Sequence, residues 1–441
     1  MRKRENVIAI FDIGKTNKKI FLFDKNFNVA YRRSTRFEEI VDDDNYPCDD
    51  IESIEEWLKA TIAELQKQDR FLIKAINFST HGATLVYLDK EGNRITPLYN
   101  YLKPLQGVDF TSFYKKYEGV EAFSRKTASP AYGMLNAGLQ IHWLKNHKHH
   151  FWAKVTAILH YPQYLSYLFS GEIKADFTSI GAHTALWNFD NMKYHSWLQK
   201  ERINLPEPTN GKKATITEIN GQKIAIGTGL HDSSASIIPL LESTKNRNRK
   251  FVLLSTGTWI ICMNPFSKET LTQEQLKNNC LCFMTPDKKQ VKSSMQFLGR
   301  IHEVYVKALS NYFGVAIDTH LNLDIYDPLC SELIDKNARI FLAKGKDTDF
   351  EAHPELLKKF TSYETAYYQL VYEISKKVIA GIDFISDKNT VISDIYISGG
   401  FNRNKIFVKF LMLLKRNTNI KISDCKNESA LGAALLMAEY I

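Results

Sequence analysis

A glycine-bearing turn between two strongly apolar runs occurs twice in this chain, and that repeat limits the available folds more than any other feature. Residues 7–24 read VIAIFDIGKTNKKIFLFD, and residues 251–265 read FVLLSTGTWIICMNP. Runs rich in Ile, Val and Phe favour strands, and the Gly, Asn and Thr residues between them favour turns. Each segment therefore predicts a β-hairpin. Because the turn glycines Gly14 and Gly257 lie more than half the chain apart, the repeat predicts two α/β domains of related architecture.

Helices and strands alternate around both hairpins. The pattern predicts a third strand at 27–36, a helix at 52–68, strands at 73–80 and 84–93, helices at 136–147 and 162–171, and a strand–turn–helix unit at 223–241. After the second hairpin it predicts a helix at 363–387, a strand–turn–helix unit at 394–414 and a small-residue helix at 428–440. The polar run 242–250 is the best linker. We therefore place an N-terminal domain at 1–243 and a C-terminal domain at 244–441.

Composition narrows the class of protein. The chain has 441 residues, a net charge of +9 and 24% charged residues, which is ordinary for a soluble multidomain protein. That charge is too small for this length to indicate nucleic acid, and the basic stretch 145–154 is typical of a solvated helix end. No apolar run has the length of a signal peptide or a membrane span. The six cysteines form no zinc pattern, so we expect reduced thiols, a cytoplasmic location, and neither a membrane nor a nucleic-acid partner.

The first turn contains Gly14-Lys15-Thr16, the end of a nucleotide-binding P-loop, but it does not fit that motif. Ala9 stands where the first glycine is required, and a predicted strand rather than a helix follows. Two interpretations remain from the residues alone. One is an ordinary hairpin turn. The other is an anion nest, in which backbone N–H groups around Gly14 converge on a phosphate.

The nest interpretation gives the polar residues of both turns a role. In the first turn, Lys15, Thr16 and Asn17 add donors, and Asp12 holds Mg²⁺ through water, because Mg²⁺ favours oxygen ligands and keeps much of its hydration. The second turn offers Thr256, Gly257 and Thr258 in a like position. Two such turns on facing domains would clamp a triphosphate. Trp259, flanked by apolar residues, is expected in the core.

Five motifs in order resemble the FGGY carbohydrate kinases, within the actin-like ATPase superfamily: FDIGKTNKK, GLHDSSAS, STGTW, ISGGFNRN and ALGAALLMA. Together they run through nearly the whole chain. STGTW and residues 178–198 are most similar to the rhamnulokinase and L-fuculokinase side of the family. The resemblance implies an α/β fold of two actin-like, ribonuclease H-like domains with a ligand cleft between them. It also implies that the N-terminal domain binds the sugar and supplies the catalytic base, and that the C-terminal domain binds the nucleotide.

The resemblance implies specific residue roles in the phosphorylation of a sugar hydroxyl by ATP with Mg²⁺. Asp232 takes the position of the general base, although the residues alone favour a simple N-cap for a helix at 233–241. Gly399 and Gly400 would approach the adenosine, with Asn404 as a donor to the nucleoside. The predicted sugar contacts are His81, Gly82, Lys103 and Asp232.

Departures from the family pattern leave the sugar open among ketoses of the rhamnulose, fuculose, xylulose or ribulose type. Lys103 stands in a stretch where many members carry Arg and Asp, and Gln163 stands where many carry Asp. The expected partners are a small-molecule sugar and ATP, and a homodimer is compatible with the family. The alternative is a catalytically inactive sensor on the same fold, which the retention of Asp12 and Asp232 disfavours.

Overall fold

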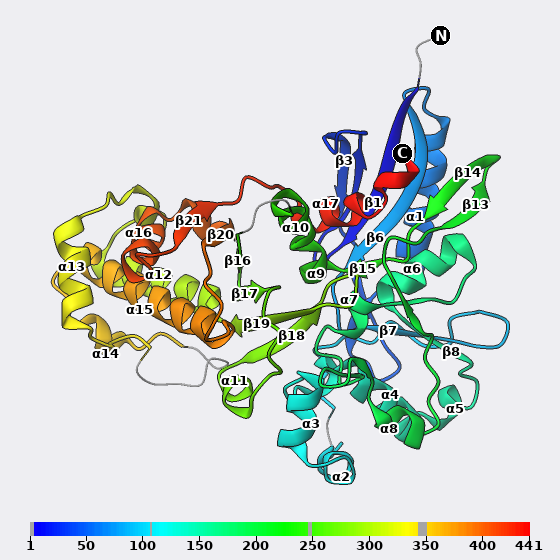
Figure 1. Ribbon diagram of the computed structural model, residues 1–441, viewed down its shortest axis with the longest axis horizontal. Coiled ribbons are helices and arrows are strands. Elements are labelled where there is room, and N and C mark those ends of the chain that lie inside the picture. Colours follow the sequence, from blue (N-terminus) through cyan, green and yellow to red (C-terminus); the bar gives the residue numbers. More distant parts are fainter. Residues whose placement is uncertain (1–3, 106–107, 246–248, 343–350) are drawn as a thin grey trace.

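The computed structural model describes residues 4–105, 108–245, 249–342 and 351–441. Each domain is built on one mixed sheet, and the two sheets lie in separate parts of the molecule (Figure 1). The first has the strand order β13-β14-β6-β1-β2-β3, with β15 also pairing with β6, and the second has the order β18-β19-β17-β16-β20-β21. The predicted α/β class is confirmed.

The first domain carries its central sheet and a helical region with short strand pairs. The strands of its central sheet are β1 (Glu5–Ile13), β2 (Lys18–Phe23), β3 (Val29–Thr35), β6 (Phe71–Thr80), β13 (Thr215–Ile219), β14 (Gln222–Ile226) and β15 (Leu230–His231). The short paired strands are β4 (Glu39–Val41) with β5 (Pro47–Asp49), β7 (Leu85–Leu88) with β8 (Ala157–His160), β9 (Ala175–Asp176) with β12 (Pro208–Thr209), and β10 (Trp187–Asn188) with β11 (Lys193–Tyr194). The helices are α1 (Ile51–Lys67), α2 (Thr111–Lys116), α3 (Val120–Thr127), η1 (Gly133–Leu135), α4 (Ala137–His147), α5 (His149–Trp152), α6 (Tyr161–Ser170), α7 (Phe177–Ile180), α8 (Ser196–Lys200), α9 (Asp232–Ser236) and α10 (Ile238–Thr244).

The long helix α15 (Tyr363–Phe384) packs against β17 and β19 of the second sheet, and α12 (Leu298–Phe313) packs against α15. Its strands are β16 (Phe251–Thr256), β17 (Ile260–Asn264), β18 (Cys280–Met284), β19 (Gln290–Gln296), β20 (Asp394–Gly399) and β21 (Asn419–Ile422). The helices after β17 are α11 (Gln273–Lys277), α12 (Leu298–Phe313), η2 (Thr319–Asn322), α13 (Asp327–Lys336), α14 (Pro354–Leu357), α15 (Tyr363–Phe384), η3 (Gly400–Arg403), α16 (Lys405–Leu414), α17 (Glu428–Leu435) and η4 (Ala438–Tyr440).

Both predicted hairpins form, and they occupy equivalent places in the two sheets. β1 lies between its antiparallel partner β2 and the parallel strand β6, and β16 lies between antiparallel β17 and parallel β20. The run VIAIF in β1 is buried on both faces, as expected for a central strand with parallel pairing. The two glycine turns therefore come at the ends of matching central strands.

The last helix, α17, leaves the second domain and packs on the first (Figure 1). Ala430, Ala433 and Ala434 share a buried apolar core with Ile8 and Phe21 of the first sheet. The predicted ranges 1–243 and 244–441 thus separate the two sheets, but α17 belongs with the first. Residues 246–248 of the predicted linker lie outside the described residues, and α10 extends to Thr244 within it.

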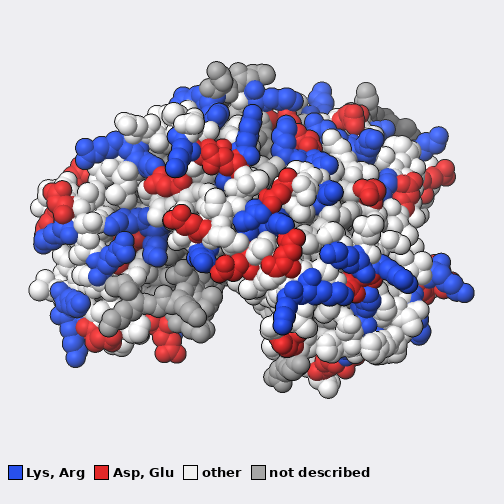
Figure 2. All heavy atoms as spheres, turned by 60° about the horizontal axis from the view of Figure 1, so that its bottom comes forward, with Lys and Arg blue, Asp and Glu red and all other residues white. Residues whose placement is uncertain are grey.

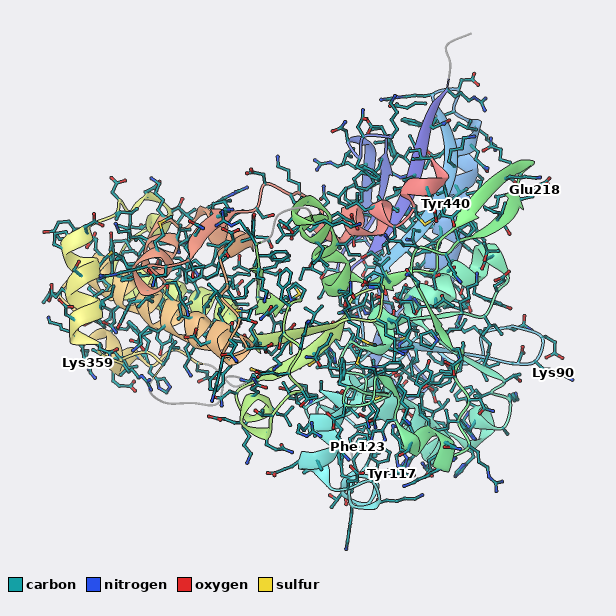
Figure 3. The ribbon with its side chains drawn as sticks, in the orientation of Figure 1. Lys90, Tyr117, Phe123, Glu218, Lys359 and Tyr440 are labelled. Carbon is teal, nitrogen blue, oxygen red and sulfur yellow. The ribbon has the colours of Figure 1, made fainter. Side chains whose placement is uncertain are left out.

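Aromatic side chains hold the helical region of the first domain together. Tyr117 of α2's end and Phe123 of α3 both pack against the ring of Phe113, with centroids 5.0 and 5.3 Å away (Figure 3). Among the described helices, none combines the length and apolar character that a membrane crossing requires. The face in Figure 2 is hollowed between two masses and carries charges of both signs, interspersed rather than segregated.

Candidate functional site

A cavity of about 870 Å³ opens beyond the carboxyl ends of β16 and β20, the edge where α/β sheets commonly bind ligands. Six residues predicted to contact the nucleotide line it: Thr256, Gly257, Thr258, Gly399, Gly400 and Asn404. They come from two segments far apart in the sequence. The structure therefore brings the second hairpin turn and the glycine turn after β20 into one cavity.

The two glycine turns are locked together by Thr256. Its hydroxyl donates to the carbonyl of Ser398 and accepts the N–H of Phe401 at 3.0 Å. Gly399 has a φ of +81°, and a Cβ there would lie 1.8 Å from the carbonyl oxygen of Thr256. At Gly257, by contrast, a Cβ would meet only the carbonyl oxygen of Trp259, at 3.8 Å. Gly399 is thus required by the protein's own packing, whereas Gly257 faces open space.

Asn404 is held at the start of α16 on the cavity wall. Its Oδ1 accepts the N–H of Phe407 at 3.0 Å, and its Nδ2 donates to the hydroxyl of Tyr367 at 2.8 Å. The ring nitrogen Nε2 of His302 lies 3.0 Å from the same hydroxyl. Burial lowers the pKa of His302 to about 3, so this imidazole is neutral near pH 7. Asn404 keeps one amide N–H for a ligand.

Asp232 faces a second, smaller cavity of about 230 Å³ that both domains line. The other lining residues include Ser255 at the end of β16, and Glu428 and Ser429 at the start of α17. Glu428 also lines the larger cavity, so the two cavities share a wall. The predicted base and the predicted nucleotide turns therefore converge.

Asp232 is the first residue of α9 rather than its N-cap, which is His231. One carboxylate oxygen accepts the N–H of Ser233 at 2.6 Å and lies 3.4 Å from Nε2 of His231. Burial lowers the pKa of His231 to about 3, so that ring carries no charge near neutral pH. Burial also raises the pKa of Asp232, and the nearby His81 opposes that rise when it is protonated.

Asp12 lies at the end of β1, where the first hairpin meets α17. The hydroxyl of Ser429 donates to its Oδ1 at 3.0 Å, and Nζ of Lys19 is 3.8 Å from its Oδ2. Burial raises the pKa of Asp12, Lys19 opposes the rise, and the negative charge of Asp232 adds to it. The two carboxylates are thus close enough for each charge to act on the other.

The remaining residues of the first turn point elsewhere. Nζ of Lys15 lies 2.8 Å from Glu39 and 3.4 Å from Asp49. The side-chain oxygen of Asn17 accepts from Nε of Arg36 at 2.9 Å, and its backbone carbonyl accepts the N–H of Gly14 at 3.1 Å. Neither cavity has Gly14, Lys15, Thr16 or Asn17 among its lining residues. Their phosphate contacts stay a prediction.

His81 and Gly82 lie close to Asp232 and to its neighbour His231, and neither is among the residues that line the larger cavity. His81 is 9% exposed, and its Nδ1 is 3.1 Å from the carbonyl of Gly82. Its buried Nε2 lies 3.9 Å from Oδ2 of Asp49 and has no hydrogen-bond partner among the described residues. A Cβ at Gly82 would lie 3.0 Å from the ring of His231. The ring of His81 packs 5.4 Å from that of Tyr101.

Tyr101 lines a third cavity, of about 460 Å³, together with Lys103, Tyr132 and Trp259, so that several of its walls are aromatic. Trp259 is 39% exposed, so the expectation that it lies in the core is wrong. The apolar residues after it are buried in β17, but Trp259 itself still belongs to the turn, where alternation no longer applies.

Lys103 lines this cavity, but its charge is neutralised by the first domain. Its Nζ lies 2.6 Å from carboxylate oxygens of both Asp42 and Asp44, and Lys148 completes the cluster. Gln163 is buried and donates to the carbonyl of Gly229 at 2.8 Å, so it holds the strand that leads to Asp232. The groups nearest to the Gln163 amide are the acceptors Asp176 and the carbonyl of Gly229, which suit an amide donor.

Residues 7–236 match the family model for the N-terminal domain of the FGGY family of carbohydrate kinases, which is more than half of the chain. The chain belongs to the FGGY family of carbohydrate kinases. A rhamnulokinase from Yersinia pestis bv. Antiqua (strain Angola) is 24% identical over 287 residues, covering 61% of this chain and 56% of that protein. The chain therefore spans little more than half the length of the curated relatives it matches.

Solved structures of FGGY-type architecture match nearly the whole chain. A carbohydrate kinase from Novosphingobium aromaticivorans has a TM-score of 0.80 at 18% identity, covering 98% of this chain and 91% of that one. A ligand-bound xylulose kinase from Lactobacillus acidophilus has a TM-score of 0.78 at 16% identity, covering 99% and 89%. A Plasmodium falciparum glycerol kinase with ADP has a TM-score of 0.71 at 15% identity, covering 99% and 90%. The predicted fold of two actin-like domains is confirmed.

Sequence reasoning missed several residues at this FGGY site. Ser429, Glu428 and Arg32 contribute to the cavities or to Asp12, and none belonged to a predicted contact. Ser429 stands just before the ALGAALLMA motif, which gave a local signal. Arg32 stands in a strand with no motif, so the sequence gave no signal for it.

Proposed function

We propose that the protein is an ATP-dependent carbohydrate kinase that transfers the γ-phosphoryl group to a hydroxyl of a sugar, a ketose of the rhamnulose, fuculose, xylulose or ribulose type. The observation that carries this proposal is the convergence at Asp232. Its cavity shares Glu428 with the larger cavity at the glycine turns. A sugar near Asp232 and a nucleotide in the larger cavity would therefore meet at their reacting ends.

The site chemistry suits phosphoryl transfer, which depends mainly on positioning and on neutralisation of charge. Asp232 accepts the proton of the attacking hydroxyl, since its carboxylate lines the smaller cavity in which that hydroxyl would lie. Burial raises its pKa, which makes the carboxylate a stronger proton acceptor than an ordinary Asp. The exposed turn at residues 257–259 would offer backbone N–H groups to the phosphates, apart from that of Gly257, which donates to the carbonyl of Trp259 at 3.0 Å.

Mg²⁺ fits the donor set at the junction, because Asp12 and Glu428 supply the hard oxygen ligands that this ion prefers. Ser429 donates to Oδ1 of Asp12, and Nζ of Lys19 lies 3.8 Å from its Oδ2. The ion, when bound, neutralises phosphate charge. Asp12 would hold it through water, and Ser429 would keep the carboxylate oriented.

The acceptor sugar is proposed to lie between Asp232 and the aromatic cavity. His81 and Gly82 form one wall, and Tyr101 and Trp259 provide apolar faces suited to the C–H groups of a sugar. Lys103 would contact the sugar as part of its ion-paired cluster with Asp42 and Asp44, rather than as a free cation. Gly14, Lys15, Thr16 and Asn17 would approach the phosphates only if the domains close.

A coupled ADP-release screen across ketoses, sugar alcohols and aldoses tests the proposal. Asp232→Asn should lose turnover by at least about a thousandfold while ADP binding persists. Asp69→Asn, an exposed carboxylate of the same domain, serves as the control. Normal turnover by Asp232→Asn would refute its role. A chain that binds nucleotide but phosphorylates no sugar would favour the inactive sensor instead.

A further inference from the structure

The first domain contributes an unpaired cation to the large cavity, and it is not one of the lysines in the FDIGKTNKK motif. Lys15 is bound to Glu39 and Asp49, and the buried Lys18 is bound to Asp49. Both lysines are therefore turned away from the large cavity. The side chain that reaches it from the first sheet is Arg32 of β3.

Strand register places Arg32 on the correct face. Arg32 pairs with Phe21, which pairs with Ile10, so the three side chains share one face of the sheet. Phe21 and Ile10 pack in the core beneath α17. β3 is the edge strand, so Arg32 extends beside α17 toward Glu428, which lines the same cavity.

Within the described part of the chain, the Arg32 guanidinium makes no hydrogen bond or ion pair with another side chain. A guanidinium offers five donors in a rigid fork that matches phosphate oxygens. The other permanently charged cations lining this cavity, Arg403 and Lys426, come from the second domain or from the approach to α17. Among the residues that line this cavity, Arg32 is the cation that comes from the first sheet.

We propose that Arg32 binds the polyphosphate of the nucleotide from the first domain and so couples nucleotide binding to closure of the two domains. The proposal rests on the proposed function, since it takes the ligand of the large cavity to be a nucleoside triphosphate. A nucleotide held by Gly257 and Gly400 on one side and by Arg32 on the other bridges the two sheets. Its adenosine end, which lies by Asn404, does not need Arg32.

Calorimetric titration with ATP, ADP and adenosine tests this without relying on turnover. Arg32→Ala should weaken ATP binding by roughly tenfold or more, as expected for loss of a charge-assisted hydrogen bond, and leave adenosine binding within about twofold. Arg32→Lys, which keeps the charge but not the fork, should lie between the two. Arg33→Ala is the matched control, because Arg33 is the next residue on β3 but faces Glu64 on the opposite side. It should bind ATP like the wild type.

Small-angle scattering gives a second readout. A non-hydrolysable ATP analogue at saturation should compact the wild type and Arg33→Ala, but compact Arg32→Ala less. Unchanged ATP affinity in Arg32→Ala, or an equal loss for adenosine, would overturn the inference. If the wild type bound no nucleotide at all, the proposed function would fail first. Wild-type binding with an unaffected Arg32→Ala variant would overturn the role of Arg32 alone.

Discussion

Substitution of Gly257 separates phosphate binding from folding more cleanly than any other change in the site. Gly257 is exposed at the turn between β16 and β17, and its backbone is not in the left-handed region. A Cβ would meet only the carbonyl oxygen of Trp259, at the ordinary contact distance of 3.8 Å. Gly257→Ala should therefore change the free energy of unfolding by no more than about 0.5 kcal/mol.

The cost should appear in nucleotide binding instead. A methyl group on the turn would keep the phosphates from the backbone N–H groups, and the loss of one charge-assisted hydrogen bond costs about 1.5–3 kcal/mol. This corresponds to an increase of about 10- to 150-fold in the dissociation constant of ADP. Gly257→Val should weaken binding at least as much, because its side chain is larger and branched.

Calorimetric titration with ADP and urea denaturation on the same samples measure both quantities. Gly399→Ala is the contrasting variant, because its Cβ would lie 1.8 Å from the carbonyl oxygen of Thr256 at a φ of +81°. It should lose stability as well as binding. Unchanged ADP affinity in a stable Gly257→Ala protein would show that phosphates do not approach this turn, and the clamp would be wrong.

Two further changes test the surroundings of the site, and a third tests a buried carboxylate that supports the second domain. Ser429→Ala removes the donor to Asp12 and should raise the Mg²⁺ concentration needed for half-maximal turnover severalfold, with little change in thermal stability; an unchanged Mg²⁺ requirement would refute the positioning role. Asp12→Asn should abolish Mg²⁺-dependent turnover yet stabilise the ligand-free protein, because burial raises the pKa of Asp12 above 3.8 and so disfavours its charged form. The gain in Tm of this variant over the wild type should grow as the pH rises from 3.8 through the folded pKa of Asp12, and then level off. A gain that shrank as the pH rose would contradict this reasoning. Glu373→Ala should cost about 3 kcal/mol or more in urea denaturation, because the buried carboxylate accepts the backbone N–H groups of Ile340, Phe341 and Leu342; a loss below about 1 kcal/mol would mean that water replaces it.

Local patterns predicted the elements of the fold closely. The hairpin expected within residues 7–24 is formed by β1 and β2, and the expected helix at 52–68 is α1. These elements were predictable because buried strands and amphipathic helices have hydrophobic patterns that can be recognised within a short stretch of sequence. The repeat of the hairpin was also visible, since turn chemistry is local.

Side-chain direction was not predictable where it depends on distant partners. Lys15 was expected to face a phosphate, but Glu39 and Asp49 come from a strand pair that the pattern did not reveal. Lys103 forms ion pairs with Asp42 and Asp44, which lie about 60 positions earlier in the sequence. Burial of charge demands such pairing, but the sequence does not say which of many carboxylates provides it.

The position of α17 explains why no single motif defines this site. Its small residues predicted close packing, and Gly432 supplies it, since a Cβ there would lie 2.0 Å from the backbone oxygen of Ala235 on α9. That contact fixes α17 beside Asp232, and the first turn of the helix then meets Asp12, which is 417 positions away from Ser429. Because the segment leading into α17 lines the nucleotide cavity while the helix itself packs on the first sheet, a movement of one domain against the other must shift Glu428 and Arg32 relative to Gly257. The proposed nucleotide binding and the geometry around Asp12 would therefore be coupled through α17.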